Sequence, residues 1–308
     1  MKRGMPSTRA ARAFATRGRL AATLALVVVT AIGGTPAHAG GDPARGRVVF
    51  ALAAGCSCHT AKDGPVAAGG GEVPTPFGTF YGSNITPDPD TGIGRWTDAQ
   101  IDAAIRRGLR RDGSAESPAM PYTHYAGMAD RDVDDLIAYL RTVPPVRRPN
   151  QPHQLALPLA RWGYRVWRWL FFTRVSPPVT APGAGVDRGH YLVDHLSICI
   201  DCHTARTRLG VTDLSMYLAG SAHGPNGDPV PNITPHRTGI GEWDEQDIVT
   251  LLTTRMLPNF DNVQGFMAEV VDGRGGGPGY KDAPEVDRRA IAAYLKTVPP
   301  IDNAVGDK

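Results

Sequence analysis

Cysteine is scarce in this chain, and its placement argues against a disulfide framework. Only four of the 308 residues are cysteine. They form two tight clusters, Cys56–Cys58 and Cys199–Cys202, and a histidine follows each cluster directly. Disulfide frameworks occur mainly in short, cysteine-rich secreted domains. We therefore interpret the two clusters as sites of cofactor or metal chemistry.

The chain also lacks alternating strand patterns, and its N-terminal apolar run, Leu20–Ile32, is short for a membrane span. A basic stretch precedes that run, and Ala37-His38-Ala39 offers a small-x-small cleavage site. We interpret residues 1–39 as a signal peptide cleaved after Ala39, with a membrane anchor as the rival. The protein is then periplasmic, with membrane association left open.

An excess of basic charge is missing once the signal is removed. Residues 1–39 hold six of the 33 basic residues and no acidic one, which leaves 27 basic against 30 acidic residues. The overall charge of +3 therefore belongs to the signal, and the sequence gives no reason to expect nucleic-acid binding.

The remaining chain contains an internal repeat. Arg45-Gly46 recurs as Arg188-Gly189 at an offset of 143, and the cluster histidines recur at 144. Asn84-Ile85-Thr86-Pro87 recurs as Asn232-Ile233-Thr234-Pro235; Trp96 recurs as Trp243 at 147, and the final Pro-Pro at 155. Each step in the offset marks a length difference. One lies inside or just before the first cluster, and another at the glycine-rich stretch 272–279.

The repeat predicts an all-α fold with two tandem domains, residues 40–146 and 183–308. Helices are expected over about 43–54 and 186–196, from Thr97 through 109, from Asp244, and over 133–140 before Pro144. Residues 147–182 form the predicted linker, with an aromatic and arginine-rich helix around Trp162–Phe172. We interpret this helix either as packed between the domains or as a surface that contacts a partner or the membrane.

The second cluster carries the stronger motif. Cys199-Ile200-Asp201-Cys202-His203 matches C-x-x-C-H, the attachment motif of c-type haem. One helical turn presents two thiols to the haem vinyl groups, and the histidine that follows reaches the iron. A disulfide or half of a zinc site is the alternative, but zinc requires a second ligand pair.

The first cluster departs from this pattern, because Cys56-Ser57-Cys58-His59 reads C-x-C-H. We expect Cys58 to form a thioether and His59 to bind iron. Cys56 is two residues from Cys58, which a regular helix places on nearly opposite sides. Either the backbone distorts, or Cys56 stays free and one bond holds the haem.

Each iron requires a second axial ligand for electron transfer, most often methionine. Met120 lies in the loop Pro118–Tyr122 and is the first candidate, with Met128 as its rival. The tryptophan offset places Met267 rather than Met256 in the equivalent position of the second domain. Five histidines are weaker candidate ligands: His124, His190, His195, His223 and His236. Asn84, Trp96, Asn232 and Trp243 are interpreted as shaping haem pockets or as ordinary loop packing.

These motifs together resemble the cytochrome c subunits of bacterial alcohol, aldehyde and gluconate dehydrogenases. The resemblance rests on the haem motifs, on Asn84-Ile85-Thr86-Pro87-Asp88 and Thr91-Gly92-Ile93-Gly94-Arg95-Trp96, and on Pro118-Ala119-Met120-Pro121-Tyr122. It implies class I cytochrome c domains with His/Met iron, His59 and Met120 binding one and His203 and Met267 the other. It also implies a flavin- or quinone-dependent dehydrogenase as electron donor and a respiratory acceptor.

Three functions compete at this point. The first is a dihaem electron carrier with covalent haem c at Cys56, Cys58, Cys199 and Cys202, without a substrate site of its own. The second is a dihaem enzyme, peroxidase-like or a small-molecule oxidase, in which one iron has an open position. The third is a structural or metal-binding module without haem. Two candidate methionine ligands favour the electron carrier.

Overall fold

The computed structural model describes residues 40–155, 160–172, 181–224 and 227–305. The predicted signal peptide, residues 1–39, lies outside the described residues. Residues from 38 onward form one compact unit. The division at residues 146 and 183 stays a prediction, and the first copy and second copy below mean residues 40–146 and 183–308.

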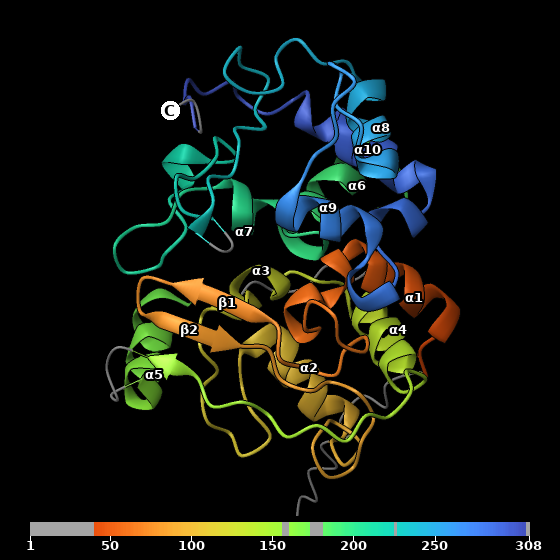
Figure 1. The fold of residues 1–308 in the computed structure, drawn as a ribbon, viewed down its shortest axis with the longest axis vertical. Helices are drawn as coiled ribbons and strands as arrows, with labels where there is room; N and C mark the ends of the chain where they lie inside the picture. Colours follow the sequence, from red (N-terminus) through yellow and green to blue (C-terminus); the bar gives the residue numbers. More distant parts are fainter. Residues whose placement is uncertain (1–39, 156–159, 173–180, 225–226, 306–308) are drawn as a thin grey trace, which may run out of the picture. The chain divides into compact units, whose positions relative to one another are not determined.

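The first copy contains four α-helices and most of a small sheet (Figure 1). Its elements are α1 (Pro43–Leu52), a 3₁₀ turn (Ala54–His59), β1 (Glu72–Thr75), β2 (Gly78–Tyr81), α2 (Asp98–Arg107), α3 (Tyr122–Tyr125) and α4 (Asp130–Leu140). The predicted capping box forms, since Thr97 Oγ1 accepts from Gln100 N and Gln100 Oε1 accepts from Thr97 N.

The second copy repeats this helical order, with a longer connection before its last helix. Its elements are α6 (Gly185–Tyr191), a π turn (Leu192–Leu196), α7 (Cys199–His203), α8 (Glu245–Thr254), α9 (Gly265–Asp272) and α10 (Glu285–Leu295), with 3₁₀ turns at Leu214–Met216, Arg274–Gly276 and Tyr280–Asp282. Asp244 caps α8 as predicted, by accepting from Asp247 N.

The prediction that strands are lacking is wrong. Strand β1 pairs antiparallel with β2, and β2 pairs antiparallel with β3 (Gln154–Leu155). Strands of four and two residues are too short to display an alternating pattern. The sheet also draws residues 154–155 of the predicted linker onto the first copy, where Asn150 Oδ1 accepts from Asn84 N as well.

The predicted linker helix is present as α5 (Ala160–Phe171). Its inner face contacts both copies, since Trp167 Nε1 donates to Leu209 O at 2.7 Å and Arg168 Nε donates to Arg107 O at 3.0 Å. Its outer face is apolar and exposed: Trp162 is 71% and Trp169 82% accessible to solvent. Both interpretations of this helix therefore have support in its packing.

The repeated Arg-Gly pair marks a close helix crossing in each copy. A side chain at Gly46 would come within 1.8 Å of Asp135 O on α4, and one at Gly189 within 1.9 Å of Ala290 O on α10. Arg45 Nε donates to Asp135 at 2.7 Å. Arg188 Nε likewise donates to Asp287 at 2.8 Å. Glycine permits the contact, and the arginine secures it with a charged hydrogen bond.

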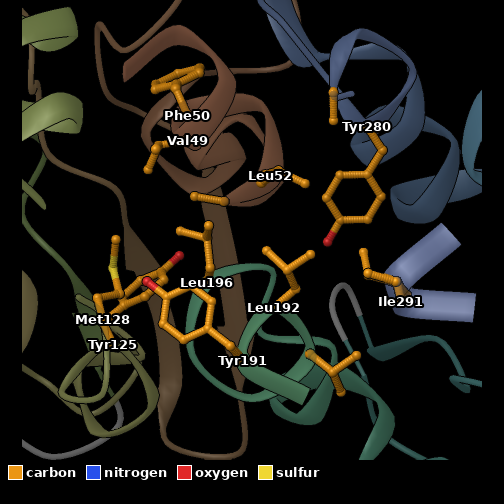
Figure 2. Packing of buried hydrophobic residues seen from close by; sticks show 14 of the residues in the cluster. Val49, Phe50, Leu52, Tyr125, Met128, Tyr191, Leu192, Leu196, Tyr280 and Ile291 are labelled. Carbon is orange, nitrogen blue, oxygen red and sulfur yellow. The ribbon is translucent and has the colours of Figure 1, made fainter. Parts of the chain in front are cut away.

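The two copies share one hydrophobic core. Leu192 and Leu196 of the π turn are fully buried among Leu52 and Met128 of the first copy and Ile291 of the second (Figure 2). Across this boundary Tyr191 Oη donates to Asp132 at 2.6 Å and accepts from Ala129 N at 3.0 Å. The shared core places the two cysteine motifs near each other.

Candidate functional site

One large cavity gathers all the predicted cofactor residues. Its volume is about 1800 Å³, whereas a pocket for one drug-sized ligand holds about 300–1,000 Å³. Its lining includes the four cysteines, both motif histidines and both first-choice methionines: Cys56, Cys58, His59, Met120, Cys199, Cys202, His203 and Met267. The fold thus brings eight residues spread over 212 positions onto one cavity, which has room for more than one large cofactor.

The motif histidines are held in one tautomer. His59 Nδ1 lies 2.7 Å from Ser83 O, and His203 Nδ1 lies 2.9 Å from Pro231 O. A carbonyl oxygen only accepts, so Nδ1 carries the proton and Nε2 keeps its lone pair for a metal. Burial lowers the pKa of both rings, which favours the neutral form that binds iron.

The last backbone hydrogen bond before each cysteine motif differs between the two copies. Ala53 N donates to Val49 O, four residues back, whereas Ser197 N donates to Leu192 O, five residues back. Val49 and Leu192 are equivalent positions of the repeat, so the π turn takes up the extra residue of the second copy. The length difference therefore lies just before the motif rather than inside it.

The first motif has a distorted backbone. Counting back from the histidines, Ala54 (φ 53°) and Ile198 (φ 48°) occupy equivalent positions, and both are left-handed. The second motif then continues as the regular helix Cys199–His203. In the first motif Gly55 (φ 61°) and Cys56 (φ 44°) remain left-handed. This distortion is how two cysteines only two positions apart both come to line the cavity.

All four cysteines are unpaired thiols, and each is half-buried on the cavity wall. Burial raises the pKa of Cys56 and Cys199 to about 12 and that of Cys58 to about 11. Burial also raises the pKa of Cys202. The raised pKa values favour the neutral thiol, the form whose S–H adds across a vinyl group.

The methionines differ in their surroundings. Met120, in its loop, and Met267, in the first turn of α9, are both partly buried on the cavity wall. Met128 also reaches the cavity but is a fully buried core residue, 1% exposed. Met256 is 37% exposed and is absent from the cavity lining. The geometry is thus compatible with Met120 and Met267 as ligands.

The repeated Asn-Ile-Thr-Pro loops are organised by their asparagines. Asn84 Oδ1 accepts from Thr86 N and Thr86 Oγ1, while its Nδ2 donates to Val146 O at 2.8 Å. Asn232 makes the equivalent bonds to Thr234 and Ile301. These amides fasten the loop to the end of each copy. Trp96 and Trp243 are partly buried on the cavity wall.

Four of the weaker histidine candidates bond to protein groups. His124 Nε2 lies 3.5 Å from Asp201 Oδ1, and His195 Nδ1 donates to His124 O. His190 pairs with Asp194 and His236 with Thr238. His223 lines the cavity, and its backbone N–H donates to Ser221 Oγ.

Sequence reasoning missed two buried tyrosines. Tyr125 and Tyr280 line the cavity, and burial raises the pKa of both well above the usual range. Tyr280 Oη donates to Ser197 O at 3.0 Å. The two residues are 155 positions apart, which is the offset at the end of the repeat. This spacing could have identified them as equivalent residues of the two copies.

This donor set fits two haem groups of c type. It consists of two cysteine–histidine motifs, each with an available histidine Nε2, and of one methionine sulfur from each copy on the cavity wall. Comparison with known proteins agrees. The sequence profile of the cytochrome c family matches residues 43–144. A diheme c-type cytochrome of Cereibacter sphaeroides is 40% identical over 276 residues, which cover 85% of this chain and 88% of that protein.

The chain belongs to the dihaem c-type cytochromes. It carries two covalently attached haem c groups. This cytochrome is also similar to the cytochrome c subunit of a quinone-dependent alcohol dehydrogenase of Gluconobacter oxydans, 37% identical over 83% of this chain, and to that of a gluconate 2-dehydrogenase of Pantoea cypripedii, 36% identical over 79%. It spans 55% and 56% of those two proteins.

Within the described residues, no helix combines the length and the apolar character required to cross a membrane.

Proposed function

We propose that this cytochrome takes electrons from a flavin- or quinone-dependent dehydrogenase and passes them through its two haems to a respiratory acceptor. The carrying observation is that two histidines, each with Nε2 available, and two methionines line one cavity. The names of the relatives, cytochrome subunits of alcohol and gluconate dehydrogenases, support the choice of donor.

Each haem supplies an iron that gains or loses one electron, and the protein residues set where and how readily this happens. His59 and Met120 are the proposed axial ligands of the first iron, and His203 and Met267 those of the second. The carbonyls of Ser83 and Pro231 orient the imidazoles and increase their basicity through the bonds to Nδ1.

The thiols of Cys56, Cys58, Cys199 and Cys202 form the proposed covalent links. Each thiol adds across a vinyl double bond: the sulfur bonds one carbon, and its hydrogen goes to the other carbon. Atoms and electrons balance without an oxidant or reductant. These links would hold each haem against the mostly apolar cavity wall, formed by residues such as Ile105, Leu136 and Leu252, which would exclude water from the iron.

Electron transfer between the two haems is supported by the proximity of the motifs. Tyr125 of the first copy is buried beside charges and thiols of both motifs, Cys58 and Cys202 among them. His124 contacts Asp201, the residue directly before Cys202. Haems held by the two motifs would therefore lie close enough for an electron to pass between them inside the protein.

The proposed site of this exchange is the periplasm, which the signal-peptide pattern of residues 1–39 supports. The outer face of α5 is the proposed contact with the membrane surface. Trp162, Trp169 and Leu170 are 71%, 82% and 55% exposed, Arg165 is exposed beside them, and α5 contains no acidic residue. Tryptophan and arginine on one helix side favour the interface of an anionic bilayer.

An intact mass under denaturing conditions, together with visible spectra, tests the proposal. We expect two haem masses on the mature chain and c-type bands without a CO-induced change in the reduced form. One haem mass contradicts the two-haem electron path. Stoichiometric CO binding instead indicates an open iron and supports the peroxidase-like or oxidase alternative.

A further inference from the structure

The glycine-rich loop 272–279 of the second copy lies against the attachment motif of the first copy. We call these residues the cross loop. Arg274 Nη1 donates to Ser57 O, between the two cysteines, at 3.3 Å, and Arg274 Nε lies 3.2 Å from Glu269 Oε2. The Arg274 side chain is only 12% exposed. A largely buried guanidinium that is ion-paired with Glu269 thus donates to the backbone of the first motif.

The contact between the cross loop and the first motif is close on both sides. A Cβ at Gly55 would come within 2.8 Å of Pro278 O, and one at Gly275 within 2.5 Å of Gly64 O and 2.7 Å of Thr60 Cγ2. Gly55 and Gly275 also have positive φ values of 61° and 63°. Both surfaces therefore depend on glycine, for space and for conformation.

The first motif is the one that requires outside support. Ala54 and Cys56 are non-glycine residues in the left-handed region, which L-amino acids adopt reluctantly. The second motif has Ile198 alone in that region and then forms a regular helical turn. Such a backbone persists only where surrounding contacts determine it.

The second motif receives a contact from the first copy at the equivalent position. Asp201 corresponds to Ser57 at the offset of 144, and it is reached by His124, in the segment after Met120. Arg274 lies in the segment after Met267. Each copy therefore supports the attachment motif of the other through the segment that follows its own candidate methionine ligand.

We propose that Arg274 and the cross loop are positioning elements that hold the first motif in its left-handed form, so that Cys56 and Cys58 both bond the first haem. The inference rests on the proposed haem attachment at this motif. The extra length at 272–279 then supports a motif whose first cysteine stands one position nearer to the second than in the second copy. Arg274 acts through its hydrogen bond to the carbonyl oxygen of Ser57 and does not itself contact the cysteine–haem bonds.

The test compares the thioether bonds of three variants by peptide mapping of the mature holoprotein. In Arg274→Ala we expect the Cys56 thioether to be lost from most molecules, with those at Cys58, Cys199 and Cys202 intact. Arg274→Lys keeps a donor and is expected to restore much of the bond. Arg289→Ala removes an exposed arginine paired with Glu285 on α10 and is expected to change nothing.

A motif exchange separates positioning from a general loss of stability. By the structural count Gly55 stands where the second motif has Cys199, so Gly55→Cys with Cys56→Ala creates C-x-x-C-H without a change in length. This motif can form a regular helical turn instead of the left-handed one in which a Cβ at Gly55 meets Pro278 O, so its two thioethers should form and should survive Arg274→Ala. If Arg274→Ala removes thioethers that the exchanged motif forms when Arg274 is present, Arg274 serves overall folding and the proposal is overturned.

The outcomes for the native protein keep the two proposals apart. Two haems with a Cys56 thioether in the wild type, lost in Arg274→Ala, support the inference. The inference is overturned if both proteins carry two haems and the Cys56 thioether is as complete in Arg274→Ala as in the wild type. It is also overturned if the wild type carries two haems but never forms the Cys56 thioether. Both results leave the proposed function intact. A single haem in the wild type contradicts the proposed function itself.

Discussion

His124 Nε2 lies 3.5 Å from Asp201 Oδ1, so the segment behind Met120 touches the residue between the cysteines of the other motif. The contact is largely buried, with the two side chains 11% and 20% exposed. Arg206 of the second copy also donates to Asp201, so this carboxylate contacts one residue from each copy. This link makes the surroundings of one haem dependent on the position of the other copy.

The His124 contact predicts a pH-dependent stability. Burial lowers the pKa of His124, and Asp201 only partly offsets this. The unfolded chain therefore binds a proton that the folded protein resists, so stability is full above the unfolded pKa of about 6.5 and falls as pH drops below it. We expect His124→Gln to reduce the fall in Tm of the holoprotein between pH 7 and pH 5.5. His190→Gln, at an exposed site, is the control, and an unchanged fall in His124→Gln would contradict the assignment.

Replacing Met120 by alanine is expected to lower the midpoint potential of one haem and to leave that of the other haem unchanged. Axial ligands shift haem potentials over a range of about 0.8 V, so the expected drop is on the order of tenths of a volt, with CO binding to one haem. Met128→Ala serves as the matched comparison. It is expected to cost about 2–5 kcal/mol of stability as a core truncation and to leave both potentials near their original values. Spectroelectrochemical titration distinguishes the two, and the reverse pattern would make Met128 the ligand.

The outer face of α5 predicts binding to anionic bilayers. Trp162→Ser with Trp169→Ser should abolish co-flotation of the holoprotein with phosphatidylglycerol-containing vesicles, because it removes the two most exposed apolar side chains of that face. Phe260→Ser, at a residue 84% exposed on another segment, should retain it. If the wild type remains in the unbound fraction, the face serves a protein partner instead.

The helix crossings predict a strong effect of a single methyl group. Gly46→Ala and Gly189→Ala place a Cβ within 2 Å of a carbonyl oxygen on α4 or α10, and we expect each to destabilise the protein by about 1–3 kcal/mol or more. Gly163→Ala on α5 meets nothing within 4 Å, so it should be neutral or stabilise slightly through helix propensity. Chemical denaturation of the three holoproteins provides the measurement, and equal stability of Gly46→Ala and wild type would refute the close crossing.

The sequence by itself determined the local chemistry. The thiols and imidazole of each motif stand within five positions of one another, the Thr97 capping box spans four residues, and the helix patterns repeat over a few turns. Interactions of this range are set by neighbours in the chain and can be read from spacing. The offset between Trp96 and Trp243 also selected Met267, which lies on the cavity wall, over Met256, which does not.

Only the tertiary structure decided how the copies support each other. Ser57 and Arg274 are 217 positions apart, and the sheet pairs residue 79 with residue 154. No periodicity records such contacts, because they depend on how the shared core closes around Leu192 and Leu196. The π turn and the left-handed Cys56 follow from the same packing, which overrides local preference where the two motifs meet.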